Sequence, residues 1–414
     1  MPLKFQSIFL AGLLACATAS SAQEIRRALP VEQPTPTVPR EIRRALPVNP
    51  APPQPTPPPP SAPLISSAPV AAATVNDTAR FLAGLPISEN SSLLPLAREP
   101  SWQQHAAFFN QAWAKLAARQ FAGIRNWETN YLPEASGPIP VVYYMFSGPD
   151  YLYADQFFPS ASTYILAGTE PIGPLPDVTR FAGPSLDAVL HNLQTALNSV
   201  LSFSFFITKD MKTDLQREEL KGTLPIFYVF LARAGKTITD ITFLTLDKNG
   251  DPHITGPPAP SRGTTLGVRI TFAGAPGSAP QTLYYFTTDL SDEGIRSRPG
   301  FLKFCSQQNV GVSLLKSASY LMFVPGFETV RNFLLTHSKT LIQDDSGIPT
   351  TAFDPTKWDL RLFGSYSTPI DLFKQHFQPE LQTLYGQSHP PPLEFGIGYR
   401  WSRSRSTLIV ARHK

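Results

Sequence analysis

The sequence has few cysteines, and it lacks the motifs of the common metal and nucleotide sites. Only two of its 414 residues are cysteine, so no disulfide can form within the chain if Cys16 leaves with a cleaved leader and Cys305 remains. Seven histidines are scattered without H-E-x-x-H, and C-x-x-C is missing, so no zinc site is expected. The patterns G-x-G-x-x-G, G-x-x-x-x-G-K-[ST] and G-x-S-x-G are missing as well. The cofactor therefore stays unknown, and an ordinary α/β-hydrolase is disfavoured.

The chain also has little net charge and no long apolar run. The formal net charge is +4, and charged residues make up 16% of the chain. This balance argues against the dense basic face of a dedicated nucleic-acid-binding protein. No uninterrupted apolar run reaches the ~18 residues that a membrane-spanning helix needs. We therefore expect neither nucleic acid as a partner nor a transmembrane helix.

What the chain does contain begins with an export signal. Residues 1–22, MPLKFQSIFLAGLLACATASSA, place Lys4 before a short apolar run and small residues before Gln23. This order is typical of a bacterial secretory signal peptide, so we expect a periplasmic or extracellular protein that begins at Gln23. The segment LLAC offers an alternative, in which Cys16 is acylated and anchors the protein to a membrane.

A proline-rich segment follows the signal peptide. Residues 23–76 contain EIRRALPV twice, at 24–31 and 41–48, and the run PPPP at 57–60. Proline fixes φ and removes a backbone donor, so this segment is predicted to be a disordered linker rather than a folded unit. Its paired arginines allow an electrostatic contact with an anionic surface, at about 1 kcal/mol per charge near a membrane.

Residues 77–414 are predicted to form a single α/β domain. Helical spacing of apolar residues predicts helices at 101–131, 151–158, 185–207, 210–222, 224–235, 327–337 and 371–385. Short β-rich runs predict strands at 141–146, 163–166, 238–246, 267–272, 282–287, 340–343 and 358–366, and a hairpin from 395–401 and 407–411. The expected fold is a mixed, partly parallel sheet flanked by helices. The pattern leaves open an antiparallel subdomain at 236–298.

Polar side chains follow three of these strands directly. Strand, short helix and strand within residues 141–166 form a compact βαβ unit, whose strands should be parallel neighbours. The carboxyl ends of parallel strands share one edge of a sheet, which is where ligands bind in open α/β sheets. The candidate catalytic acids at that edge are Asp150, Glu170, Asp344 and Asp345. The candidate binding residues are Ser147, Tyr151, Tyr153 and Ser346, and no metal ligands are assigned.

One short segment resembles part of two protease families. The triplet Asp345-Ser346-Gly347 is similar to the aspartate segments of subtilisin-like and pepsin-like proteases. The His-Gly and Gly-Thr-Ser segments of the former are missing, and so is the second Asp-[Ser/Thr]-Gly copy of the latter. We therefore interpret the triplet as a turn at the end of a strand.

Two functions of different classes fit this pattern. The first is a non-catalytic exported protein that binds a small molecule, an envelope ligand or a protein partner. The second is a secreted hydrolase or transferase that uses strand-end carboxylates as general acid and base, or as ligands of a divalent cation. The non-catalytic function is favoured because the sequence contains no recognisable catalytic nucleophile, set of metal ligands or cofactor-binding motif. The second requires that the acids converge in one cleft.

Overall fold

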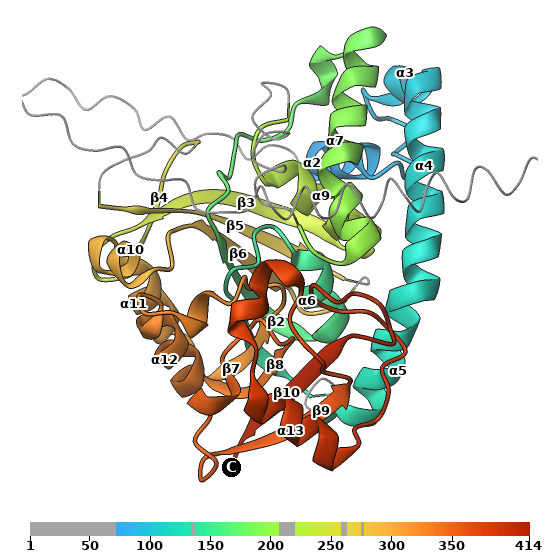
Figure 1. Cartoon of the computed structure of the whole chain (residues 1–414). Coiled ribbons are helices and arrows are strands. Elements are labelled where there is room, and N and C mark those ends of the chain that lie inside the picture. Colours follow the sequence, from blue (N-terminus) through green and yellow to red (C-terminus); the bar gives the residue numbers. More distant parts are fainter. Residues whose placement is uncertain (1–71, 134–136, 207–219, 258–262, 275–276) are drawn as a thin grey trace, which may run out of the picture. The chain divides into compact units, whose positions relative to one another are not determined.

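The computed structural model describes residues 72–133, 137–206, 220–257, 263–274 and 277–414 (Figure 1). The predicted signal peptide with Cys16, nearly all of the predicted linker and most of the predicted helix at 210–222 lie outside these residues. The predictions about export and anchoring therefore stay predictions. No helix in the described ranges combines the length and the apolar character that crossing a membrane requires.

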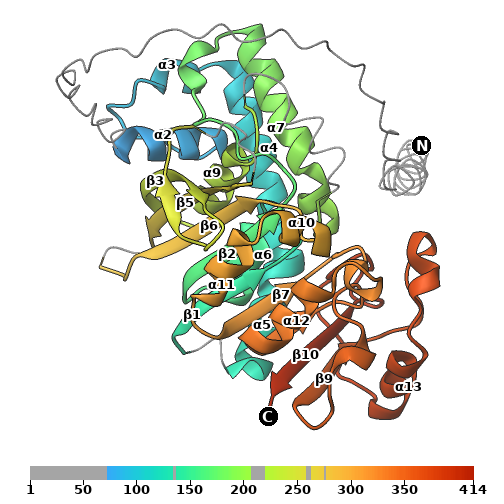
Figure 2. The ribbon, with the colours of Figure 1, turned by 90° about the vertical axis from the view of Figure 1, so that its left-hand side faces the viewer.

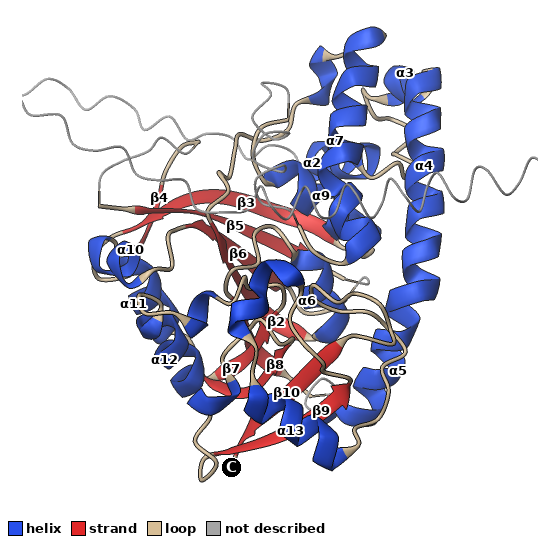
Figure 3. Cartoon of the chain, in the orientation of Figure 1, coloured by secondary structure: helices blue, strands red, loops and turns tan. Residues whose placement is uncertain are grey.

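Five parallel strands form the centre of one ten-stranded sheet. They run in the order β6, β2, β1, β7 and β8, with bounds Gln281–Thr287, Ala161–Gly168, Ile139–Tyr144, Gly311–Leu315 and Ser338–Gln343. β1 and β2 are parallel neighbours, with Val141 opposite Thr163 and Tyr144 opposite Leu166. The predicted βαβ unit is therefore confirmed, and Figure 3 shows the mixed sheet between its helices.

Antiparallel strands continue the sheet on one side. The strands β4 (Pro252–Ile254), β3 (Thr237–Leu246) and β5 (Thr265–Ala273) lie beyond β6. β6 pairs antiparallel with β5 on one side and parallel with β2 on the other. The strands at 236–298 thus pair antiparallel with one another, and they belong to the same sheet as the parallel centre.

The other side of the sheet ends with β10 and β9. β10 (Thr407–His413) lies between β8 and the edge strand β9 (Trp358–Gly364), antiparallel to both. The predicted hairpin is wrong, because residues 395–401 form no strand. They fold back as a loop in which Gly398 has φ +69° and the Ile397 amide donates to Ser406 Oγ.

Helices cover both faces of the sheet. One face carries α2 (Ala72–Leu82), α4 (Pro100–Leu116), a π-helical turn at Ala117–Phe121, α5 (Ala122–Tyr131), α6 (Tyr151–Phe157), α7 (Pro184–Phe203) and α9 (Leu224–Arg233). The other face carries α10 (Asp292–Ser297), α11 (Gly300–Ser306) and α12 (Glu328–His337). Side chains alternate across β1, so that Val142 and Tyr144 enter the first core while Val141 and Tyr143 enter the second. This double cover explains why the central strands are apolar on both faces.

Two further differences from the predictions have local causes. The predicted helix at 371–385 is two pieces, a 3₁₀ helix at Asp371–His376 and α13 at Pro379–Ser388. Pro379 pushes the preceding Gln378 out of the helical region, to φ −113° and ψ 95°. The strand β7 was not predicted, because Gly311–Leu315 is short and begins at a glycine.

Candidate functional site

The carboxyl ends of the parallel strands meet at one edge of the sheet, as their register requires. The loops that leave this edge carry Ser147, Glu170, Lys316 and Asp344, after β1, β2, β7 and β8 respectively. The five charged residues near this edge, Asp150, Glu170, Lys316, Asp344 and Asp345, are each less than 4% exposed, so this edge is closed rather than open to solvent.

Asp150 is held from three sides. Its Oδ1 accepts a hydrogen bond from the Tyr153 amide at 3.3 Å and caps the first turn of α6. Its Oδ2 accepts from the Tyr144 hydroxyl at 2.8 Å and forms an ion pair with Lys316 Nζ at 2.8 Å. Burial raises the pKa of Asp150, while the ammonium of Lys316 and the Tyr144 hydroxyl act in the opposite direction.

Lys316 belongs to the same buried group, and the sequence pattern did not indicate it. It directly follows β7, and its side chain is 1% exposed. Its Nζ lies 4.1 Å from the centre of the Tyr153 ring and donates to the Ser204 carbonyl. The only signal in the sequence is a lysine at the end of a short apolar run, and that run was not recognised as a strand.

Asp344 lies next to the same loop. Its Oδ2 accepts from the Ser317 amide at 2.9 Å, and its Oδ1 accepts from both the amide and the hydroxyl of Ser346. Burial raises the pKa of Asp344 against these hydrogen bonds. Asp150 and Asp344 therefore bind consecutive residues, Lys316 and Ser317, and so share one buried polar network.

Asp345 has a pKa raised to about 7, because it is buried and because the charge of Asp344 is close. Its Oδ2 accepts from the Tyr320 hydroxyl. The loop that carries this tyrosine has Ser317, Ser319 and Tyr320 at φ between +53° and +55°. A left-handed backbone conformation at a non-glycine residue costs energy, and such residues are found most often at functional sites and ligand-binding loops.

Glu170 belongs to a separate group. Its Oε2 accepts from the Tyr285 hydroxyl at 3.2 Å, and its carbonyl accepts from Tyr285 and Thr287. Gly168 is tightly enclosed, because a Cβ there would lie 2.3 Å from Glu170 Oε2 and 2.8 Å from Gly148 Cα. The two loops are thus in contact, although the hydrogen-bond partners of Glu170 are Tyr285 and Thr287 and not the groups around Asp150, Asp344 and Asp345.

The remaining candidates have mixed positions. Tyr153 contacts Lys316, as described above. Tyr151 donates to Asp155 and packs edge-on against Tyr164 in the core, away from the acids at the strand ends. The Ser147 hydroxyl donates to the Gly148 carbonyl. The catalytic and binding roles of all eight candidates stay predictions. Within the described ranges, no group of three or more His, Cys, Asp or Glu side chains is arranged to hold a metal ion.

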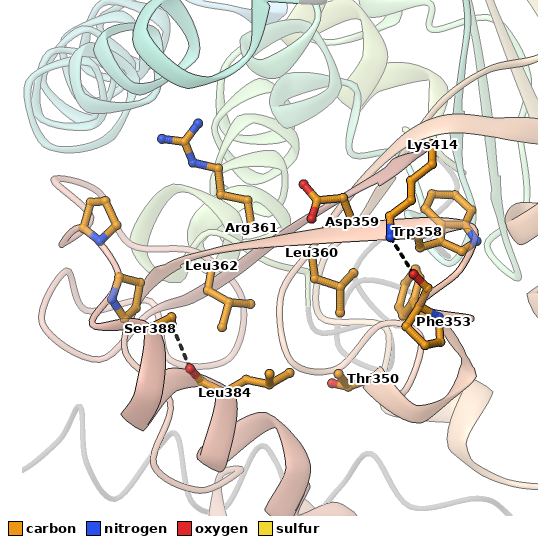
Figure 4. Close-up of a pocket in the computed structure, with 13 residues that line it drawn as sticks. Thr350, Phe353, Trp358, Asp359, Leu360, Arg361, Leu362, Leu384, Ser388 and Lys414 are labelled. Atoms are coloured by element: carbon orange, nitrogen blue, oxygen red, sulfur yellow. Dashed lines mark hydrogen bonds between the residues drawn. The ribbon is translucent and has the colours of Figure 1, made fainter.

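An open site lies elsewhere, along the edge strand β9. A groove of about 650 Å³ separates β9 from α13 and is lined by Thr350, Phe353, Pro355, Trp358, Asp359, Leu360, Arg361, Leu362, Leu384, Ser388, Pro390, Pro391 and Lys414. Figure 4 shows Leu360 and Leu362 on one side of the strand and Asp359 and Arg361 on the other. Figure 2 shows β9 at the outer end of the sheet, beside α13.

Comparisons with known proteins add no relative. No protein family model matches the chain, and searches of curated proteins and of solved structures find no match either.

Proposed function

We propose that this chain is an exported, non-catalytic binding protein that receives an extended peptide segment of a partner along β9. The observation that carries the proposal is an edge strand with a groove beside it. An extended peptide can add a strand to such an edge, with main-chain hydrogen bonds for affinity and side-chain pockets for specificity.

The pairing of β9 with β10 determines which backbone groups of β9 point outward and could bind a peptide. The Ser365 amide donates to Ser406 and the Lys414 amide donates to Lys357, so the odd-numbered residues of β9 point their backbone groups toward β10. The even-numbered residues then point outward. Gly364 confirms this direction, because its amide donates to the Pro391 carbonyl at 2.8 Å outside the sheet.

Leu360 and Leu362 therefore present their N–H and C=O groups outward. In the described part of the chain, β9 pairs with β10 alone. Pro391 already accepts a hydrogen bond from the outer side of β9, at Gly364. A peptide that extends along β9 from that point could pair with the outward N–H and C=O groups of Leu360 and Leu362. The side chains of Leu360 and Leu362, with Leu384 across the groove, offer an apolar floor. We therefore expect a partner segment with alternating apolar residues and little charge.

The buried acids at the carboxyl ends of the strands support a non-catalytic role. Asp150, Asp344 and Asp345 all accept bonds from neighbouring groups of the chain and are 1–3% exposed. Their hydrogen-bonding capacity serves internal partners, which is the role of a structural network.

Selection from a displayed library of random linear peptides tests the proposal. Enriched peptides should have apolar residues at every second position. They should also protect the amides of Leu360 and Leu362 from hydrogen exchange. Leu384→Asp should remove this binding. Phe108→Asp is the matched control, because Phe108 is 37% exposed on α4 and Leu384 is 36% exposed.

Two results would contradict the proposal. One is a selection that yields no binder, or binders that tolerate Leu384→Asp. The other is a dimer whose Leu360 and Leu362 amides are protected without peptide, which would assign the edge to a second copy of the chain.

We keep a secreted hydrolase or transferase as a second candidate, because a pKa of about 7 at Asp345 suits general acid–base catalysis at neutral pH. A panel of ester and glycoside substrates tests it. Turnover that disappears in Asp345→Asn would support this function, and no turnover by the folded wild type would reject it.

A further inference from the structure

The ion pair of Lys316 and Asp150 is unusual in how completely it is buried. The two side chains are 1% and 3% exposed, and their charged atoms lie 2.8 Å apart. Taking two charges out of water is costly, and the neutral forms of both groups avoid that cost. An uncharged amine beside a carboxylic acid is the starting point of amide formation.

We propose that Lys316 and Asp150 become joined by an isopeptide bond between Nζ and Cγ. The contacts around the pair suit this reaction. Two N–H groups of the neutral amine would face the Ser204 carbonyl and the Tyr153 ring, which leaves its lone pair toward Asp150. The Tyr153 amide would hold the oxyanion on Oδ1, and the Tyr144 hydroxyl would assist departure of Oδ2.

The atoms balance without a further reactant. One proton passes from Nζ to Oδ2 across the 2.8 Å contact, which turns ammonium and carboxylate into amine and acid. The nitrogen lone pair then adds to Cγ. The Cγ–Oδ2 bond breaks, and Oδ2 leaves as water with the proton it already carries and a second proton from nitrogen. The product is one neutral amide, so the buried charges disappear.

Such a bond would fasten the ends of two adjacent parallel strands. Asp150 follows β1 and Lys316 follows β7, and these strands pair directly. The bond would close a long loop of the chain, which restricts the unfolded state as a disulfide does. It would also be insensitive to reductants. That property suits an exported chain with so few cysteines, so this inference is compatible with the proposed function and does not depend on it.

Intact mass spectrometry of the purified, denatured full chain tests the inference. The wild type should be lighter than its calculated mass by one water. Tryptic digestion should leave the Lys316–Ser317 bond uncut, because the acylated side chain is no longer basic. Residues 126–180 and 304–331 should then appear as one branched peptide.

Two variants sharpen the test. Lys316→Arg keeps the positive charge but should show its full calculated mass. Asp150→Asn should lose ammonia instead of water, and so should reach the same final mass as the wild type. A wild-type chain of full calculated mass that trypsin cleaves after Lys316 would overturn the proposal, because that result needs no variant and does not depend on folding yield.

Discussion

At the scale of single residues, Asp345 connects burial to pH dependence. Its folded-state pKa of about 7 lies above the usual value of a free aspartate, about 3.9. Between these values the folded state binds more protons than the unfolded state, so the free energy of unfolding falls as pH rises from about 4 to about 7. Above pH 7 this contribution is fully lost. Asp344 acts in the same direction, because its pKa is raised too.

We therefore expect Asp345→Asn to flatten the pH profile. The variant should match the wild type near pH 4.5 and exceed it near pH 8 by on the order of 2–4 kcal/mol. Urea unfolding between these pH values measures the difference. Asp354→Asn is the control, because Asp354 is an exposed turn residue whose pKa is lowered. Equal pH slopes in the wild type and Asp345→Asn would contradict this account.

A second residue-scale prediction concerns Gly398. A Cβ at this position would lie 1.9 Å from Asp344 Oδ2, and the backbone has φ +69°. Gly398→Ala should therefore lower the free energy of unfolding by on the order of 2–5 kcal/mol. Gly386 in α13 has nothing within 4 Å of such a Cβ. Gly386→Ala should instead stabilise the chain by about 0.5–1 kcal/mol, since alanine favours helix. Thermal unfolding of both variants measures these changes. A Gly398→Ala variant as stable as the wild type would show that the loop is not closely packed on Asp344.

At the scale of elements, the side chain of Gln343 bridges the loop that follows β8. Gln343 accepts from the Ile348 amide and donates to the Ile348 carbonyl, both at 2.8 Å. Gly347 is necessary here, because a Cβ would lie 2.5 Å from Gln343 Oε1. The clamp spans the segment that carries Asp344 and Asp345, so it orients both acids.

Gln343→Leu should leave the buried amide and carbonyl of Ile348 without partners. We expect a loss of about 2–4 kcal/mol in the free energy of unfolding, from two unsatisfied groups. Gln307→Leu on the surface should change stability by less than about 0.5 kcal/mol. Denaturant unfolding of the two variants measures this difference, and similar losses would show that the clamp adds nothing.

At the scale of the whole molecule, export is the prediction with the widest consequences. Residues 1–22 have the order of a signal peptide, so the mature chain should begin at Gln23. Mass spectrometry of the N-terminal peptide from fractionated bacterial cells tests this. An acylated Cys16 at the start would instead establish a lipid anchor. An intact Met1 in the cytosolic fraction would refute export.

The double helical cover also follows from the whole molecule. Each strand of the parallel centre has apolar side chains on both faces, and each face has its own hydrophobic core. The local pattern predicted four of the five central strands, all but β7, and most of the helices, because burial of apolar residues at a given period is encoded along the chain itself. The βαβ unit was predictable for the same reason, since the short helix leaves its two strands only one compact arrangement.

Sequence alone therefore determined four of the five central strands and the helix between β1 and β2, and it showed that acids follow the strands. Only the tertiary structure decided what those acids contact. Lys316 meets Asp150 because β7 inserts beside β1, and such a pairing between distant segments leaves no local pattern. β10 likewise pairs with β8 and β9 rather than with residues 395–401, which lie nearest to it in sequence. Strands pair with segments that are distant in sequence. The local periodicity of apolar residues indicates which side chains are buried, but it does not indicate which strand lies next to which.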